Sequence, residues 1–332
     1  MPSNPTANVG CASAHHLRHC GVLTHTLLLL FCCTTLLAHP IPTEKRIPAT
    51  RRSTLTAPDK DPMHMPTDVA VDSKLRVFVA DGANDRILQF APDGHLEQTL
   101  TDPGNQKLNR PIGLAIDSSD QLWIADTANH RLLVLSPDGL KATPITAPKL
   151  DESSAPPDPT DIAITPDGRR TYIVDNKHHR ILIRDNQTFK WTALGEPGKA
   201  LGQFQYPFMI TVGPENYVYV TEAVGARVQL ISPAGRLAGQ LGQWGVELGH
   251  FYRPKGIAAD PTGRIFVSDS TLGVIQVFSP RGTTEGVLTS NDGRPLRFQH
   301  PMGMCFDKTG RLYVTELKAN RVAIVSLKPE KK

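Results

Sequence analysis

The segment "VADGANDRILQF" (Val79–Phe90) places an acid, a glycine, an asparagine and an arginine between two short apolar runs. Five further copies of this pattern follow at intervals of 45 to 49 residues, beginning at Ile124, Ile173, Val220, Val267 and Val314. Six copies in one register indicate a repeat architecture before they indicate any chemistry.

Three positions recur in the repeats. Every copy has an acid at the end of its first apolar run: Asp81, Asp126, Asp175, Glu222, Asp269 and Glu316. An arginine follows five residues later in all copies except the fifth, where Val274 stands. A proline precedes each copy: Pro66, Pro111, Pro159, Pro207, Pro254 and Pro301. We predict that the acid and the arginine hold backbone in place, and that Gly82, Asn84, Asn129 and Asn176 adopt the left-handed conformations that tight turns need.

Each repeat reads as four short strands separated by Pro- and Gly-containing turns, with no helical periodicity. The last repeat ends after "RVAIVSL" (Arg321–Leu327) and lacks a fourth strand. The stretch "STLTAPDKD" (Ser53–Asp61) is similar to the fourth-strand segment "TPITAPKLD" (Thr143–Asp151). We therefore predict that residues 51–56 supply the missing strand and close a ring, which removes an exposed sheet edge.

This pattern resembles the NHL-repeat family, on the strength of "TANHRLL" (Thr127–Leu133), "RPIGLAID" (Arg110–Asp117) and their counterparts. The resemblance implies an all-β, six-bladed β-propeller of four-stranded antiparallel blades. We place this domain at residues 51–332 and expect a monomer. Such propellers serve as binding modules and as enzymes, so the fold alone does not give the function.

Composition narrows the classes of function. The chain has 332 residues, a net charge of +4 and 20% charged residues, which does not suggest a nucleic-acid-binding surface. Four of the five cysteines precede residue 40, so we expect no disulfide framework in the repeats. The remaining one, Cys305, lies in the apolar run "MGMCF" (Met302–Phe306) and is predicted to be a buried, inert thiol.

The first 38 residues read as a targeting segment. Arg18 precedes the apolar stretch Val22–Ala38, and no acid occurs before Glu44. This pattern fits a signal peptide, and it leaves open a retained membrane anchor or a lipidated Cys32 or Cys33. Each alternative places the protein in the periplasm or outside the cell, with the membrane contacted only through this segment. Residues 39–50 read as a linker.

The repeats also resemble the propeller of peptidyl-α-hydroxyglycine α-amidating lyases, through "PTDVAV" (Pro66–Val71) and "VADGANDRILQF". That resemblance implies zinc-binding histidines directly after three of the repeated prolines. No histidine occurs in these places, which hold Thr67, Ile112, Thr160, Phe208, Lys255 and Met302. Ala83 occupies the place of the lyases' catalytic tyrosine, and the arginine expected after the turn acid is also missing. The metal and catalytic positions are therefore unmatched, and we expect no cofactor.

Two acids follow repeated prolines at equivalent places, Asp68 in the first repeat and Asp161 in the third. They could supply oxygen ligands to a divalent metal, as in lactonase-type propellers, or they could bond backbone. His130, His178 and His179 invite a metal hypothesis, but His130 and His179 occupy the same turn position of adjacent repeats, roughly 10 Å apart in stacked sheets. We predict that they are rim histidines.

Several side chains are predicted to line one turn-rich face at the mouth of the channel. Tyr206, Arg253 and His300 directly precede repeated prolines, and Lys255 directly follows one. Tyrosine and arginine are favoured at recognition surfaces. The leading hypothesis is an exported, non-catalytic module that binds a protein, peptide or glycan there. The alternative is a metal-dependent lyase or lactonase-like enzyme acting at the channel mouth.

The mature protein is expected to begin near His39, because cleavage after Ala38 would remove the apolar segment. N-terminal sequencing of the protein purified from its native source checks this expectation. A mature chain that begins at Met1 and is recovered in the soluble cytosolic fraction would contradict it.

Overall fold

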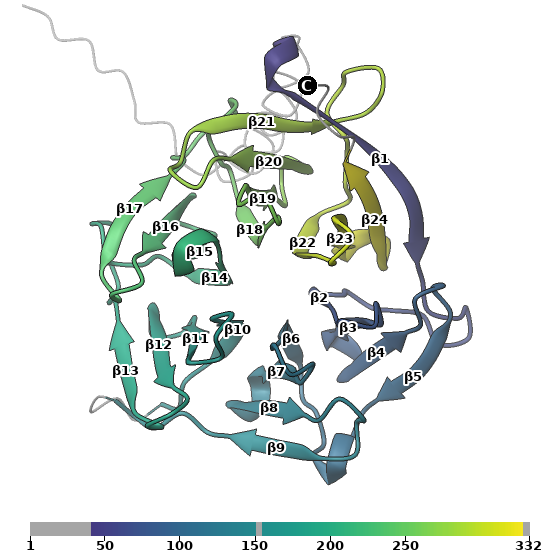
Figure 1. Ribbon diagram of the computed structural model, residues 1–332, viewed down its shortest axis with the longest axis vertical. Coiled ribbons are helices and arrows are strands. Elements are labelled where there is room, and N and C mark those ends of the chain that lie inside the picture. The colour runs from purple at the N-terminus through teal and green to yellow at the C-terminus, as the bar shows by residue number, and fades with distance from the viewer. Residues whose placement is uncertain (1–40, 151–154, 328–332) are drawn as a thin grey trace, which may run out of the picture. The chain divides into compact units, whose positions relative to one another are not determined.

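Antiparallel sheets of four strands build the folded part of this chain. The computed structural model describes residues 41–150 and 155–327, which lie in a compact unit spanning Ile41–Lys332. The predicted targeting segment 1–38 lies outside the described residues. In this unit the sheets are arranged radially around a central channel (Figure 1). The innermost strand of each sheet therefore runs along the channel.

The sheets follow the repeats in chain order. Four of them have four strands each: β2 (Asp68–Val71), β3 (Val77–Asp81), β4 (Arg86–Phe90) and β5 (Leu96–Leu100); β6 (Pro111–Ile116), β7 (Leu122–Asp126), β8 (Arg131–Leu135) and β9 (Ala142–Ile145); β10 (Pro159–Ile164), β11 (Arg170–Asp175), β12 (Arg180–Asp185) and β13 (Trp191–Leu194); β14 (Pro207–Val212), β15 (Val218–Glu222), β16 (Arg227–Ile231) and β17 (Leu237–Leu241).

The fifth sheet has eight strands, in the order β18-β19-β20-β21-β1-β24-β23-β22. Its members are β18 (Pro254–Ala259), β19 (Ile265–Asp269), β20 (Val274–Phe278), β21 (Thr284–Thr289), β1 (Arg46–Leu55), β22 (Pro301–Phe306), β23 (Arg311–Glu316) and β24 (Arg321–Leu327). Divided between β21 and β1, it gives two more units of four strands. We call all these units blades and number them 1 to 6 in chain order.

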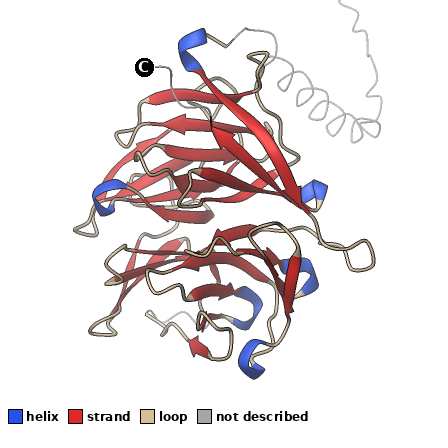
Figure 2. Cartoon of the chain, turned by 45° about the vertical axis from the view of Figure 1, so that its right-hand side comes forward, coloured by secondary structure: helices blue, strands red, loops and turns tan. Residues whose placement is uncertain are grey.

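Short 3-10 helices occupy some of the connections, as Figure 2 shows. Their bounds are η1 (Thr43–Lys45), η2 (Gly82–Asn84), η3 (Pro103–Asn105), η4 (Thr127–Asn129), η5 (Pro214–Asn216) and η6 (Leu317–Ala319). Strands dominate the described residues, which confirms the all-β prediction. Among these residues, no helix is long or apolar enough to span a membrane.

The N-terminal strand completes blade 6. Residues of β1 from Ala49 to Leu55 pair antiparallel with β24, and residues from Arg46 to Pro48 pair parallel with β21. The strand was predicted at residues 51–56 but begins at Arg46, inside the segment predicted to be a linker. Pro48 lies where the pairing partner changes, a place where its missing N–H matters least. Because proline is rare inside strands, Pro48 favoured the prediction of a linker where the first half of β1 lies.

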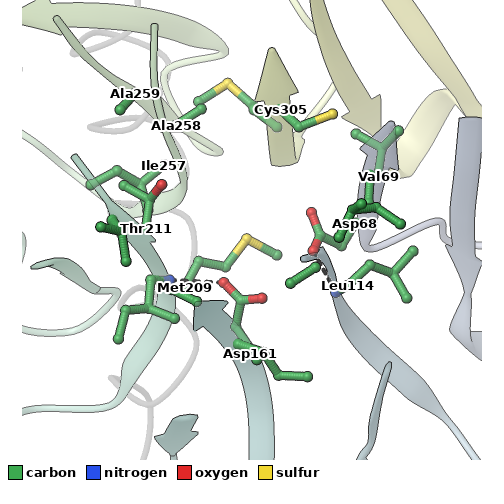
Figure 3. A pocket seen from close by; sticks show the side chains of 18 of the residues that line it. Asp68, Val69, Leu114, Asp161, Met209, Thr211, Ile257, Ala258, Ala259 and Cys305 are labelled. Carbon is green, nitrogen blue, oxygen red and sulfur yellow. Dashed lines mark hydrogen bonds between the residues drawn. The ribbon is translucent and has the colours of Figure 1, made fainter. Parts of the chain in front are cut away.

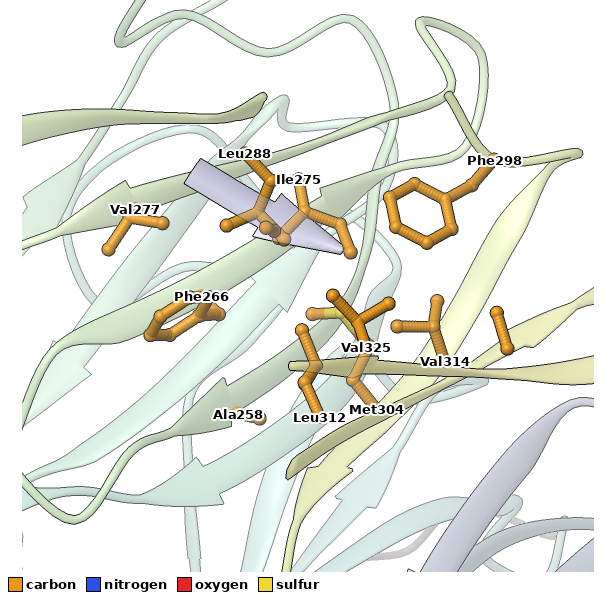
Figure 4. Close-up of a cluster of buried hydrophobic side chains, with 12 residues drawn as sticks. Ala258, Phe266, Ile275, Val277, Leu288, Phe298, Met304, Leu312, Val314 and Val325 are labelled. Carbon is orange, nitrogen blue, oxygen red and sulfur yellow. The ribbon is translucent and has the colours of Figure 1, made fainter. Parts of the chain in front are cut away.

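Apolar side chains between neighbouring blades form the core. Figure 4 shows the cluster between blades 5 and 6, where Phe266 and Ile275 meet Met304 and Leu312. The aromatic residues three places before repeated prolines are also buried, since Phe204 and Phe251 are fully covered and Phe298 nearly so. These aromatic residues therefore pack in the core between neighbouring blades.

The recurrent acids anchor the entry into each blade. Asp126 is fully buried; its Oδ1 accepts the backbone N–H of Asn109 at 2.8 Å and its Oδ2 accepts Arg131 Nε at 2.7 Å. The other blades repeat the contact with the entering backbone, and Arg86, Arg180, Arg227 and Arg321 repeat the contact with arginine. The predicted backbone role is thus confirmed.

The left-handed residue of these turns is not the predicted one. Gly82, Asn84, Asn129 and Asn176 do not have positive φ, whereas the residue directly before the arginine position does: Asp85, His130, His179, Ala226, Gly273 and Asn320. The short 3-10 turn ends there, and the chain must reverse its twist before the next strand begins. Composition alone pointed to the asparagines because they tolerate this conformation.

Removal of β1 should destabilise the protein. A chain beginning at Ala57 loses six residue pairs with β24 and the buried side chains of Ala49 and Leu55. We expect the free energy of unfolding to fall by on the order of 5 kcal/mol. A chain beginning at Ile41 is the matched control and should unfold like the full chain in a denaturant titration. Equal midpoints for the two truncated chains would contradict the role of β1 in closing the ring.

Candidate functional site

The two predicted acids lie inside the central channel. Asp68 begins β2 in blade 1, and Asp161 lies near the start of β10 in blade 3. Both are almost completely buried, and both line a cavity of about 260 Å³ that is walled by the innermost strands. Figure 3 shows their carboxyl groups directed towards the middle of this cavity. The structure thus brings together two residues separated by more than ninety positions in sequence.

Each acid connects its own blade to the next one. Asp68 Oδ2 accepts the N–H of Leu114 in blade 2 at 2.8 Å, and Asp161 Oδ2 accepts the N–H of Ile210 in blade 4 at the same distance. Both acids therefore bond backbone, which was one of the two alternatives that the sequence left open. One oxygen of each carboxyl has this bond, so the groups serve the scaffold even if they serve a ligand too.

Glycines in the preceding blades make room for these acids. A Cβ atom on Gly303 would lie 1.9 Å from Asp68 Oδ1, and one on Gly113 would lie 2.5 Å from Asp161 Oδ1. No larger residue could stand there without displacing the carboxyl group. These glycines occupy the same repeat position as the acids, two residues after the proline. This position holds Asp68, Gly113, Asp161, Met209, Gly256 and Gly303 in the six repeats, so a glycine precedes each acid around the ring, a sequence signal that the search for metal ligands overlooked.

Burial makes both carboxyl groups weak acids. Burial raises the pKa of Asp68 to about 7, although the N–H groups of Leu114 and Val69 oppose the shift. The pKa of Asp161 is raised well above its ordinary range by burial and by the nearby charge of Asp68. Two carboxyl groups that share a low-dielectric site resist double ionisation. At neutral pH the pair therefore retains a proton that it can donate or exchange.

Cys305 lines the same cavity. It is half-buried at its wall, not enclosed in the blade core as predicted, because the channel exposes one side of β22. Burial and the acids Asp68 and Asp307 raise the pKa of its thiol well above the usual value. A thiol with a raised pKa stays protonated at neutral pH, and only the thiolate is a good nucleophile. The raised pKa is therefore compatible with the predicted unreactive thiol.

The histidines of the turns contact local groups. His130 Nδ1 lies 3.0 Å from the carbonyl oxygen of Pro157, and His178 Nδ1 lies 2.9 Å from the carboxylate of Asp175. His179 Nδ1 accepts the N–H of Tyr206 at 3.1 Å. Within residues 41–150 and 155–327, no group of three or more His, Cys, Asp or Glu side chains is placed to hold a metal ion. The two carboxyl groups in the channel would need further ligands to bind one.

The turn-rich face carries the other predicted residues. Tyr206 is 50% exposed, and its ring meets His179 edge to face at a centroid distance of 4.5 Å. Tyr206 and His300 both have positive φ directly before a proline, as do Met65 and Arg110 in other blades. This conformation is unfavourable for a residue with a side chain and costs about 1 kcal/mol or more. All four residues share this backbone setting directly before the proline that leads into the innermost strand of their blade.

Cationic groups gather on one side of this mouth. Lys255 Nζ lies 3.5 Å from the ring centroid of Phe208, and Arg253 is exposed next to it in sequence. Burial and the charge of Arg253 lower the pKa of Lys255 to about 8. Burial and the cations Lys318, Lys255 and Arg253 lower the pKa of His300. The sequence identified three of these residues but missed Lys318, which follows a turn acid instead of a proline.

Side chains at the rim also join every blade to the next. A hydroxyl or amide group in each blade donates to a backbone carbonyl near the repeated proline of the following blade: Thr67 to Ile112, Thr127 to Pro159, Asn176 to Pro207, Thr221 to Lys255, Ser268 to Met302 and Thr315 to Thr67. The side chains that could bind a ligand are thus held on a ring of satisfied backbone groups. Such a surface is rigid.

Comparison with known proteins supports the same class of fold. The family model of the NHL repeat matches residues 108–135. The chain is similar to the structure of virginiamycin B lyase from Staphylococcus aureus, with 17% identity, a TM-score of 0.58, and coverage of 84% of this chain and 89% of that one. It is similar to a gluconolactonase from Xanthomonas campestris, with 14% identity, a TM-score of 0.61, and coverage of 87% and 99%.

An auxiliary nutrient binding protein from Bacteroides thetaiotaomicron is also similar, with 15% identity, a TM-score of 0.61, and coverage of 82% of this chain and 72% of that one. A comparison with curated proteins finds no sequence match. The chain is therefore a β-propeller protein. The match of one repeat to the NHL-repeat model agrees with the resemblance that the sequence motifs indicated.

The substitution Asp68→Asn should flatten the dependence of stability on pH. Folding raises the Asp68 pKa from 3.8 to about 7, so between these values the folded state binds more protons than the unfolded state. The unmodified protein should therefore lose stability as pH rises from about 4 to about 7. The amide of the variant stays neutral and can still accept the Leu114 N–H, so its loss should be smaller.

Chemical denaturation at several pH values measures this difference. Asp59→Asn, at an exposed turn position, is the control and should leave the pH dependence of the unmodified protein in place. Parallel curves for Asp68→Asn and the unmodified protein would show that Asp68 titrates normally.

Proposed function

We propose that this protein is a non-catalytic binding module that holds a protein, peptide or glycan ligand on its turn-rich face. The observation that carries the proposal is the set of side chains projected at the channel mouth. Tyr206 and His300 are held there in a strained left-handed conformation, and Arg253 is exposed beside them. Strained residues cluster where function requires a fixed side chain.

The assignment of the acids to the scaffold also supports binding without catalysis. The turn acids bond the entering backbone, and Asp68 and Asp161 each accept a backbone N–H from the next blade. The side chains left for a ligand are then aromatic and cationic, which are residue types favoured at recognition surfaces. The similar nutrient binding protein shows that this fold accompanies proteins described as binders.

We further propose that the protein acts as a monomer outside the cytoplasm, in the periplasm or beyond the cell. The support for export is the acid-free, apolar start of the chain before His39. Strand β1 covers the edge of β24 in blade 6 and, through Arg46–Pro48, part of the edge of β21 in blade 5, so these edges are not open to a second copy.

The second candidate is a lyase or lactonase-like enzyme that acts at the channel. One observation favours it: the Asp68 pKa of about 7 suits a general acid or base at neutral pH. Two of the similar structures are a lyase and a gluconolactonase, which is compatible with this candidate. Its metal-dependent form would require oxygen ligands in addition to Asp68 and Asp161.

Site-specific photo-crosslinking tests the binding function. A crosslinking residue at position 206 should capture material from the extracytoplasmic extract of the native source. The same residue at position 140 is the control, because Leu140 is 81% exposed in a turn at the far end of β8. Equal capture at both positions would contradict a ligand site on the turn-rich face.

A lactone assay separates the two candidates. The binding function predicts no hydrolysis of gluconolactone above the spontaneous rate. Hydrolysis that Asp68→Asn and Asp161→Asn abolish, without unfolding, would instead establish the enzyme.

A further inference from the structure

Four basic residues at the channel mouth differ from the repeat arginines. The repeat arginines, such as Arg131 and Arg321, bond buried turn acids. Arg253, Lys255, His300 and Lys318 form no ion pair and donate no side-chain hydrogen bond within the part of the chain that the structure describes. We call these four residues the mouth cations. Arg253, Lys255 and Lys318 can therefore present their charges to a ligand at neutral pH, whereas His300, whose pKa is lowered, presents a mostly neutral imidazole.

The mouth cations repel one another. The pKa of His300 is lowered by burial and by Lys318, Lys255 and Arg253, and that of Lys255 is lowered by burial and by Arg253. Both shifts show that the groups are close enough for their charges to interact. Unpaired like charges at a partly desolvated site cost free energy that a bound anion would offset. The cluster thus favours a ligand with more than one negative charge.

We propose that the channel mouth over blades 4 to 6 binds an acidic segment of a partner protein. Carboxylates of the segment pair with Lys255 and Arg253, and an apolar side chain of the segment packs against Tyr206. This inference rests on the proposed binding function and names its ligand class.

The positions of the cations suit a chain ligand. Tyr206, Arg253 and His300 directly precede the innermost strands of blades 4, 5 and 6, so they occupy equivalent places on consecutive blades. Binding groups at successive blades suit a chain ligand, because an extended peptide that rises about 3.3 Å per residue would span the roughly 10 Å between stacked sheets with about three residues. Lys255 directly follows Pro254, at the start of the innermost strand of blade 5, and so lies further into the channel than Arg253.

The aromatic rings at the mouth favour a peptide over a glycan. Sugars bind proteins largely by stacking on free aromatic faces. The ammonium group of Lys255 covers one face of Phe208 at 3.5 Å, and the Tyr206 ring is held edge to face by His179. Carboxylates need only the cations, and an apolar side chain can pack on the half-exposed ring of Tyr206.

A synthetic peptide of alternating glutamate and leucine residues, labelled with a fluorophore, is the probe. We expect saturable binding to the full chain at pH 7 that weakens as salt is added. Lys255→Met should weaken binding by about tenfold or more, because it removes a charge-assisted hydrogen bond. Lys74→Gln is the matched control, since it removes an exposed lysine from the β2–β3 turn at the opposite end of the channel. It should leave the affinity unchanged.

The pH profile gives a second readout. Lys255 loses its proton around pH 8, whereas an ordinary lysine keeps it until about pH 10. Affinity should therefore fall by about tenfold between pH 7 and pH 9. Lys255→Arg should bind at pH 7 and abolish most of this fall, because a guanidinium stays charged. Thermal unfolding of each variant shows that it is folded.

Three outcomes would overturn the acidic-peptide ligand. The first is no binding of the peptide, and the second is equal affinity in Lys255→Met and Lys74→Gln. The third is binding of heparin or a neutral oligosaccharide that depends on Lys255 while the peptide does not bind. The third outcome would leave the binding function of the face intact, whereas loss of position-specific crosslinking at residue 206 would remove both.

Discussion

The buried acid at the end of the second strand of each blade is the constraint on which this fold depends. A fully buried carboxylate without hydrogen-bond donors would cost a prohibitive amount of free energy, so each one must accept hydrogen bonds from the chain around it. In blade 2, Asp126 collects the N–H of Asn109 and the guanidinium of Arg131, and thereby fixes the backbone that enters the blade. Blade 5 lacks the arginine, and Asp269 instead accepts four backbone N–H groups. The donors differ, but the entering segment is fixed in both cases.

Fixed entries place the innermost strands side by side and create the channel mouth. There a second set of polar groups joins blade to blade, through hydroxyl and amide donors and through Asp68 and Asp161. Because burial raises the pKa of both acids, the negative charge expected in the channel is reduced at neutral pH. The electrostatic character of the mouth is therefore set by the cations on blades 5 and 6. The strained residues before the prolines add fixed side chains to the same rim.

The sequence by itself determined the repeat, its all-β character and the closing strand. These features depend on local pattern: acid and arginine at a fixed spacing, prolines before each inner strand, and turn residues between apolar runs. It also identified Asp68, Asp161 and most of the mouth cations by their registered positions. Its errors were local as well. The left-handed turn residue was assigned one or more places early, and Pro48 concealed the first half of β1.

Only the tertiary structure decided what these residues do together. Burial, which no single repeat can reveal, raises the pKa of Asp68 to about 7. Burial and the charge of Asp68 together raise the pKa of Asp161. Lys318 joined the mouth because its backbone N–H bonds the carbonyl of Gln299, which places the turn of blade 6 beside His300 at the entry of the same blade. The glycines at 113 and 303 matter because each faces an acid on the next blade. Distances across a closed ring are set by the packing of all its blades. The sequence therefore determines which residue types stand at the repeat positions, and the fold determines their contacts and pKa values.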